Sequence, residues 1–325
     1  YELLELSYSL WIFLKLVIAI KQFQPEFIYE RYNLYQPAGI WASKLFNIPL
    51  ILEVNAPLVD ERSRYSGLSM IKLAKRLENY TWRNATHTLP VTNVLAENLR
   101  NSGVKEQRIT VIHNGVRQQF IDEMLTKPID QNKQEIVIGF TGFIHPWHGL
   151  DKAIRAIAQH KDLPLKLVCV GEGNILPELK ALATELGLAD KIEFAGLVSR
   201  DKVLDYVEKF DIALQPDVTG YASPLKIFEY MASGKAIISS DLPVLREVLT
   251  SGVNCLLCTP DESELWVKAV GKLIDNPIEM KSLGKAAEGL QFQKAKLTFF
   301  QENGKLGSPL NQENHSVGKV VSWSD

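Results

Sequence analysis

Six short runs of β-branched and other apolar residues alternate with helix-length segments in the second part of the chain. The runs are Ile136–Phe140, Leu165–Val170, Ile192–Ala195, Ile212–Gln215, Ala236–Ser239 and Asn254–Leu257. Strands joined by crossover helices pair in parallel, because each helix returns the chain to the same end of the sheet. The alternation therefore predicts an α/β, doubly wound sheet whose ligands bind beyond the carboxyl ends of the strands.

The first 115 residues show the same alternation of strand and helix patterns, with fewer strands. The candidates are Phe27–Glu30, Leu50–Val54, Thr88–Val91 and Thr110–Ile112. Because they are too few to complete a sheet and the chain enters at Tyr1 directly into a helical pattern, we expect an N-terminally truncated, incomplete first domain. That helix, from Leu3 to Ile20, is interrupted by Lys15. A packed core helix is the favoured interpretation and a membrane anchor the alternative.

The length of 325 residues exceeds that of one ordinary α/β core and predicts two domains. The turn Asn114-Gly115 and the polar stretch Thr126–Gln134 place a linker between them. We predict a partial first domain over residues 1–115, a linker over 116–134 and a second domain over 135–290. Residues 291–325 are rich in Gln, Asn, Gly and Ser, which predicts a polar, disordered tail.

Composition excludes some partners and compartments. The formal net charge of −2 provides no bulk field that would hold nucleic acid. Cys255 and Cys258 lie in an apolar run without the second ligand pair of a zinc site, so with Cys169 they are predicted to be buried strand residues. Few cysteines and no secretory signal favour a cytoplasmic protein.

The segment from Ser223 to Gly234, SPLKIFEYMASG, follows the strand Ile212–Gln215 and has the ends of a short helix. A proline at the first turn and a glycine at the end predict a helix from about Leu225 to Ser233. Free backbone N–H groups at its start favour an anion such as a diphosphate, and Lys226 adds a positive charge. Glu229 lies one turn further, where its carboxylate can accept hydrogen bonds from ribose hydroxyls. The alternative is a helix whose Lys and Glu are merely solvated.

The same segment resembles the signature of family-four glycosyltransferases, which have the GT-B fold of two facing Rossmann-like domains. In that family two glutamates are separated by seven intervening residues. Glu229 occupies the second position and Tyr221 the first. The resemblance implies that Glu229 anchors the nucleotide ribose and Lys226 neutralises phosphate, with no metal and no other cofactor.

Three further segments resemble the family in the expected order. Phe140–Gly149 (FTGFIHPWHG) resembles the phosphate loop, with Phe143 in place of the usual first basic residue and His148 near the second. Val170–Gly173 resembles the loop that ends the next strand, and Phe194–Val198 resembles the one that frames the nucleobase. The residues this implies for donor binding are Gly142, His148, Gly149, Gly171, Gly173, Gly196, Leu197, Ser223, Pro224 and Leu225. A metal pair of His145 with His148 lacks a third ligand.

Two segments of the first domain, Glu30-Arg-Tyr32 and Glu53-Val-Asn-Ala-Pro57, each follow a candidate strand and resemble a branch associated with bacterial exopolysaccharide assembly. By this resemblance Arg31, Glu53 and Asn55 lie on the acceptor side. A structural ion pair between Arg31 and Glu53 is the alternative.

The resemblance implies a retaining glycosyltransferase that moves a sugar from a nucleoside diphosphate sugar to a hydroxyl of a saccharide or lipid-linked acceptor. Rival functions are a non-catalytic nucleotide-sugar-binding protein, favoured by Tyr221 and Phe143, and a sugar-nucleotide epimerase. A helix with Met70, Leu73, Leu77 and Tyr80 on one face suits peripheral contact with the inner face of the plasma membrane. An ordinary amphipathic core helix explains the same spacing.

Overall fold

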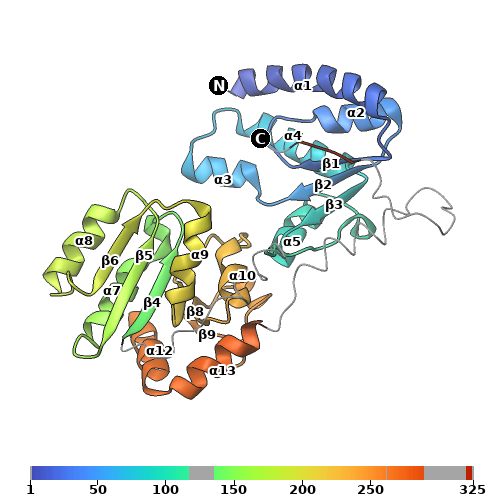
Figure 1. The fold of residues 1–325 in the computed structure, drawn as a ribbon. Helices are drawn as coiled ribbons and strands as arrows, with labels where there is room; N and C mark the ends of the chain where they lie inside the picture. The colour runs from blue at the N-terminus through green and yellow to red at the C-terminus, as the bar shows by residue number, and fades with distance from the viewer. Residues whose placement is uncertain (1, 117–134, 261, 289–319, 324–325) are drawn as a thin grey trace. The chain divides into compact units, whose positions relative to one another are not determined.

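A computed structural model describes residues 2–116, 135–260, 262–288 and 320–323. The chain forms two compact units. The first comprises Tyr1–His113, Tyr221–Ser223 and Ala295–Asp325, and the second Asn114–Gly220 and Pro224–Lys294. Each unit contains its own parallel sheet (Figure 1).

The first unit has a four-stranded parallel sheet of order β10-β1-β2-β3. Its strands are β1 (Phe27–Arg31), β2 (Leu50–Val54), β3 (His87–Pro90) and β10 (Val320–Trp323). Its helices are α1 (Glu2–Phe23), α2 (Ala38–Phe46), α3 (Leu58–Tyr65), α4 (Ile71–Asn84), α5 (Asn93–Asn101) and the 3₁₀ turn η1 (Glu106–Arg108). Buried apolar residues of the strands and helices form one core, in which Trp82 of α4 is fully buried.

The second unit has a six-stranded parallel sheet of order β6-β5-β4-β7-β8-β9. Its strands are β4 (Ile136–Thr141), β5 (Leu165–Val170), β6 (Ile192–Gly196), β7 (Ile212–Gln215), β8 (Ala236–Ser240) and β9 (Leu256–Cys258). Its helices are η2 (Pro146–His148), α7 (Leu150–Ala158), α8 (Leu176–Glu185), α9 (Arg200–Lys209), α10 (Leu225–Ala232), α11 (Pro243–Arg246), α12 (Ser263–Asp275) and α13 (Pro277–Glu288). The strand order reverses between β4 and β7, which creates the topological switch point where such sheets bind ligands.

The core of the second unit shows why the chain folds this way. Alternate residues of a strand face opposite sides of a sheet. Ile138 and Phe140 of β4 therefore join the large apolar cluster formed with α7 and α12. Gly139 faces the other side, where the ring of Phe210 occupies the space that a β-carbon at position 139 would need. The strand is thus packed closely on both faces, as its nearly unbroken apolar sequence requires.

The predicted strands agree with the structure except in one case. Thr110–Ile112 is not a regular strand: the N–H groups of Thr110 and Ile112 donate to the carbonyls of Thr88 and Pro90, but only an isolated bridge between Thr88 and Ile109 results. Cys169, Cys255 and Cys258 are buried and free, as predicted. The predicted linker 116–134, apart from residue 116, and most of the polar tail 291–325 lie outside the described residues. Within the tail, β10 pairs with β1.

The two helices considered for membrane contact behave differently from each other. The prediction of a packed core helix is confirmed for one face of α1, where Leu16 and Ile20 are buried and Leu6, Ile12 and Phe13 pack against the core, while the opposite face is exposed. By length and composition α1 is apolar enough to cross a membrane. On α4, Leu73, Leu77 and Tyr80 are partly buried against the core of the first unit, as expected for an amphipathic core helix.

The carboxyl group of Glu30, on β1, is buried against the start of α2. A β-carbon at Gly39 would collide with this carboxyl, so a glycine is needed for strand and helix to approach this closely. Burial raises the pKa of Glu30 to about 8. The folded chain therefore holds a proton at neutral pH that the unfolded chain releases near pH 4.5.

Glu30→Gln is expected to stabilise the protein at alkaline pH. Between pH 4.5 and about 8 the folded wild type binds more protons than the unfolded chain, so its free energy of unfolding falls as pH rises. Glutamine does not titrate. Urea denaturation at pH 5.0 and 8.5 should show a gain of about 1–3 kcal/mol at the higher pH and little gain at the lower. The exposed Glu26→Gln serves as the control. An equal effect of E30Q at both pH values would contradict the burial argument.

Candidate functional site at the strand switch point of the second unit

The candidate site lies where β4 and β7 part. Residues Ile138 and Gly139 of β4 pair with Ile212 and Ala213 of β7, and the register ends there. The chain then leaves β4 at Thr141 into a loop that leads to η2 and α7, while β7 leads to α10. Loops and helix starts from both halves of the sheet therefore converge at one point.

Helix α10 begins at Leu225, directly after Ser223 and Pro224, close to the predicted bounds. Pro224 has φ −70°, which suits the residue before a helix. Gly234 ends the helix in the left-handed region with φ +61°, where its N–H donates to the carbonyl of Met231. Leu225, in the first turn, is exposed. These local rules fix the direction in which the helix start points.

Lys226 is the positive group at this helix start. Its Nζ lies 3.9 Å from the ring centroid of Phe140, and its ammonium group is buried. Within the described part of the chain it forms no ion pair, although the nearby Glu229 favours its charged form. Burial lowers the pKa of Lys226 to about 7. The site thus holds a cation that an anionic ligand would stabilise.

His148 does not supply the second positive charge that its position suggests. Burial, followed by the nearby charges of Lys226 and His145, lowers its pKa to about 3. Its Nδ1 accepts a hydrogen bond from the backbone N–H of His145 at 3.2 Å, and its ring lies 5.4 Å from that of Phe140. A neutral imidazole can bind phosphate only as a hydrogen-bonding group.

Two glycines let the loops after β4 and β5 approach each other. Gly142 has φ +120°, and a β-carbon there would lie 3.0 Å from Nζ of Lys226. Gly171 has φ +139°, and a β-carbon there would collide with the carbonyl oxygen of Gly142. A side chain at position 142 would thus occupy the space beside the ammonium.

The other predicted donor-side glycines lie in the same set of loops. Gly149 joins η2 to α7, Gly173 lies in the loop before α8 and Gly196 ends β6. A β-carbon at Gly173 would collide with the carbonyl oxygen of Ile144, so this loop too is fixed by close backbone approach. Leu197 follows Gly196 and is exposed.

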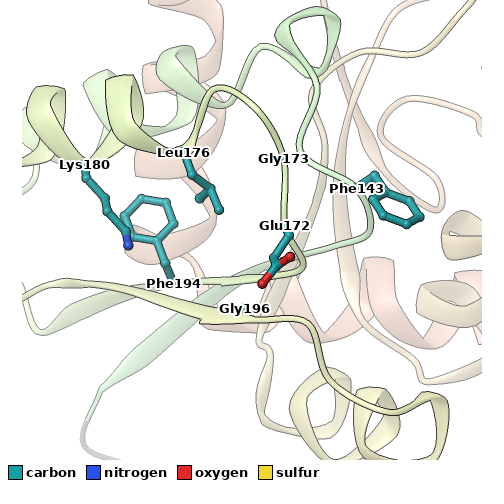
Figure 2. A pocket seen from close by; sticks show the side chains of 7 residues that line it. All are labelled: Phe143, Glu172, Gly173, Leu176, Lys180, Phe194 and Gly196. Atoms are coloured by element: carbon teal, nitrogen blue, oxygen red, sulfur yellow. The ribbon is translucent and has the colours of Figure 1, made fainter.

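Two adjoining cavities lie beside these loops. The larger, of about 450 Å³, is lined by Phe143, Glu172, Gly173, Leu176, Lys180, Phe194 and Gly196 (Figure 2). The smaller, of about 110 Å³, is lined by Gly142, Phe143, Val170, Gly171, Glu172, Leu197, Val198 and Val203. Phe143 and Glu172 line both. Figure 2 shows the carboxylate of Glu172 between the ring of Phe143 and the pair formed by Lys180 and Phe194.

The sequence analysis missed several residues of this site. Leu176 and Lys180 line a cavity, yet their types and spacing are those of an ordinary helix start. Glu172 lines it too, but within the predicted loop Val170–Gly173 it was given no role. Phe140 was predicted as the end of a strand and the start of the phosphate loop, but its contact with Lys226 was not predicted. The spacing of Lys226 and Tyr230, four residues apart on one helix, could have indicated a second residue facing the loop after β4.

The three residues predicted for the acceptor side lie in the first unit, at the carboxyl ends of β1 and β2. Arg31 and Glu53 are register partners, but they form no ion pair within the described part of the chain. Glu53 instead accepts hydrogen bonds from the Tyr29 hydroxyl and, at 2.9 Å, from the side-chain amide of Asn55. Arg31 is exposed, so this arrangement leaves its guanidinium accessible.

Two family models match the chain, one over each unit. Residues 3–120 match the model described as Glycosyltransferase Family 4, and residues 122–289 match Glycosyl transferases group 1. The chain belongs to the group 1 glycosyl transferases. The match spans the candidate site from the loop after β4 through α10.

Similar proteins agree with this family. An uncharacterised glycosyltransferase of Methanocaldococcus jannaschii is 27% identical over 219 residues, which are 66% of this chain and 56% of that protein. The MMP alpha-(1->4)-mannosyltransferase of Mycolicibacterium hassiacum is 25% identical over 267 residues, with coverage of 76% and 61%. In both comparisons the chain spans less than two thirds of its relative.

A solved structure with the same fold is that of Anabaena HepE in complex with UDP. It has a TM-score of 0.75 and 19% identity, and the match covers 92% of this chain and 82% of HepE. At this identity the likeness concerns the fold alone. This chain has the GT-B fold, with two Rossmann-like α/β domains, as predicted.

Replacing Lys226 is expected to stabilise the ligand-free protein. Below about pH 7 the folded chain buries a charged ammonium. Between pH 7 and 10.5 the unfolded chain binds the proton that the folded chain has released, so wild-type stability rises with pH. Lys226→Met should therefore raise the free energy of unfolding by about 1–3 kcal/mol at pH 6, and by less at pH 9.5, in urea denaturation. The exposed Lys161→Met is the control, and a gain that does not depend on pH would contradict the assignment.

Proposed function

We propose that this protein is a glycosyltransferase that binds a nucleoside diphosphate sugar at the switch point of the second unit and transfers the sugar to a hydroxyl. The observation that carries the proposal is the buried ammonium of Lys226 at the start of α10, beside Gly142. A diphosphate there would meet one full positive charge, the positive end of the helix dipole and free backbone N–H groups. Fixed charges of this kind stabilise a leaving diphosphate.

The remaining donor groups follow from this placement. Glu229, one turn after Lys226, accepts hydrogen bonds from the ribose hydroxyls. The base occupies the cavities around Glu172 and is framed by the backbone of Gly196 and Leu197. Gly149, Gly171, Gly173, Ser223, Pro224 and Leu225 complete the donor site, with His148 neutral beside it.

The finer features rest on resemblance to the family. Transfer retains the anomeric configuration, with departure and attack on one face of the sugar, and the departing phosphate accepts the proton of the acceptor. Arg31, Glu53 and Asn55 bind a saccharide or lipid-linked acceptor in cytoplasmic assembly of a bacterial exopolysaccharide. The exposed guanidinium of Arg31 suits an anionic or hydroxyl-rich group. Peripheral membrane contact remains a prediction, and the partly buried face of α4 does not favour that helix for it.

Thermal stabilisation by uridine, guanosine and adenosine diphosphates tests the proposal, because a ligand bound to the folded state shifts stability by mass action. A glycosylated acceptor detected by mass spectrometry would separate a transferase from a binding protein and from an epimerase, which converts the donor alone. Absence of stabilisation by all three nucleotides would refute the proposed donor site.

Lys226→Met and Glu229→Gln are expected to affect different parts of the nucleotide. K226M removes the cation, so affinity for the best nucleoside diphosphate should fall by roughly 10–100-fold while affinity for its nucleoside changes little. E229Q removes the ribose acceptor charge, so both affinities should fall. Isothermal titration calorimetry measures both constants, with Lys161→Met as the matched control. Equal losses of diphosphate and nucleoside binding in K226M would remove Lys226 from the phosphate site.

A further inference from the structure

Tyr230 joins α10 to the last residue of β4. Its hydroxyl accepts a hydrogen bond from the backbone N–H of Thr141 at 2.9 Å and lies 3.0 Å from the Thr141 hydroxyl. Tyr230 is fully buried and Thr141 nearly so. Burial raises the pKa of Tyr230 above its ordinary value, so the phenol stays neutral and can both donate and accept.

The backbone explains why this hydroxyl is needed. The N–H of Gly142 donates to the carbonyl of Val170 on β5, so the N–H of the preceding residue, Thr141, points toward β7. Pairing of β4 with β7 ends at Gly139, and β7 offers Thr141 no partner in the register. The Tyr230 hydroxyl replaces the carbonyl acceptor that a paired strand would provide to the Thr141 N–H.

The same helix face carries the phosphate-binding group. Lys226 and Tyr230 are four residues apart and therefore lie one above the other on α10. Lys226 lies over Phe140 and beside Gly142, the two neighbours of Thr141 in the chain. The ring of Tyr230 lies 6.4 Å from that of Phe210, which packs against Gly139. Helix α10 thus contacts the end of β4 twice, through Tyr230 at Thr141 and through Lys226 at Phe140 and Gly142.

We infer that Tyr230 is a positioning residue, whose hydroxyl fixes the start of α10, and with it Lys226, against the loop after β4. The inference rests on the proposed diphosphate site, because it is the distance between Lys226 and Gly142 that Tyr230 sets. A phenylalanine at this position would leave the buried Thr141 N–H without a partner, and the loop would move to reach water. The ammonium would then no longer meet the phosphate in the same geometry.

Tyr230→Phe and Thr141→Val test this role by calorimetric titration at pH 7. The probes are the tightest binder among uridine, guanosine and adenosine diphosphates and its parent nucleoside. Y230F should lower diphosphate affinity by roughly tenfold and nucleoside affinity by less than about threefold. T141V, which removes one hydroxyl from the pair, should do the same to a smaller degree, and T141S, which keeps it, should resemble the wild type. The double variant Y230F/T141V should lose less than the product of the two single losses.

Ile157→Val is the control for a purely structural effect, because Ile157 of α7 is fully buried in the same unit and its loss lowers stability without touching α10. The ratio of diphosphate to nucleoside affinity should remain that of the wild type in I157V. An unchanged ratio in both Y230F and T141V would overturn the inference while leaving the proposed function intact. If the wild type itself binds no nucleoside diphosphate, the proposed function fails and the inference with it.

Discussion

A buried ammonium at the wrong end of a helix is the constraint on which the candidate site depends. Cations are disfavoured at a helix start, where the dipole is positive, and they are disfavoured again by burial. Lys226 is subject to both effects, and its burial lowers its pKa to about 7. Such an arrangement persists when the surrounding packing over-determines it, and here Phe140, Gly142 and Tyr230 provide that packing. A dianionic ligand removes both penalties at once.

Close backbone approach is the second requirement. The loops after β4 and β5 meet where a β-carbon at Gly171 would collide with Gly142, and where one at Gly173 would collide with Ile144. Of these residues, Gly142 also lies beside the buried ammonium of Lys226. Backbone N–H groups near a cation form a concave, positive surface without adding titratable groups. Since His148 is neutral, it adds no positive charge at this point, and Lys226 is the cation there.

Much of the fold could be predicted because its parallel strands are nearly continuous apolar runs between helix-length segments. Leu50–Val54, Leu165–Val170 and Ile212–Gln215 were predicted at their observed bounds. Thr110–Ile112 was predicted as a strand, but its two hydrogen bonds to β3 give an isolated bridge and no ladder. Helix α1 was also predicted, but the exposure of most of its apolar residues was not, since an apolar sequence does not say what covers a helix.

The sequence predicted which loops form the site, but not which side chains contact one another there. The motif around Lys226 and Glu229 is local, so its helix and its direction follow from Pro224 and Gly234. The bond between Tyr230 and Thr141 joins residues 89 positions apart, and nothing in either segment indicates it. Likewise, the register places Arg31 beside Glu53, but the carboxylate of Glu53 accepts hydrogen bonds from Tyr29 and Asn55 instead.

Strands β4 and β7 pair over only two residues each. Backbone N–H groups of β4 that face β7 beyond these residues therefore need other hydrogen-bond partners. At the start of β4 the N–H of Val137 donates to the carboxylate of Asp211 at 2.8 Å. At the end, Thr141 donates to Tyr230. Side chains therefore close the edge of β4 at both ends of its short pairing with β7. The next donor beyond Thr141, the N–H of Gly142, is bonded to the carbonyl of Val170 on β5, so the loop after β4 starts from a strand end that is held on both sides.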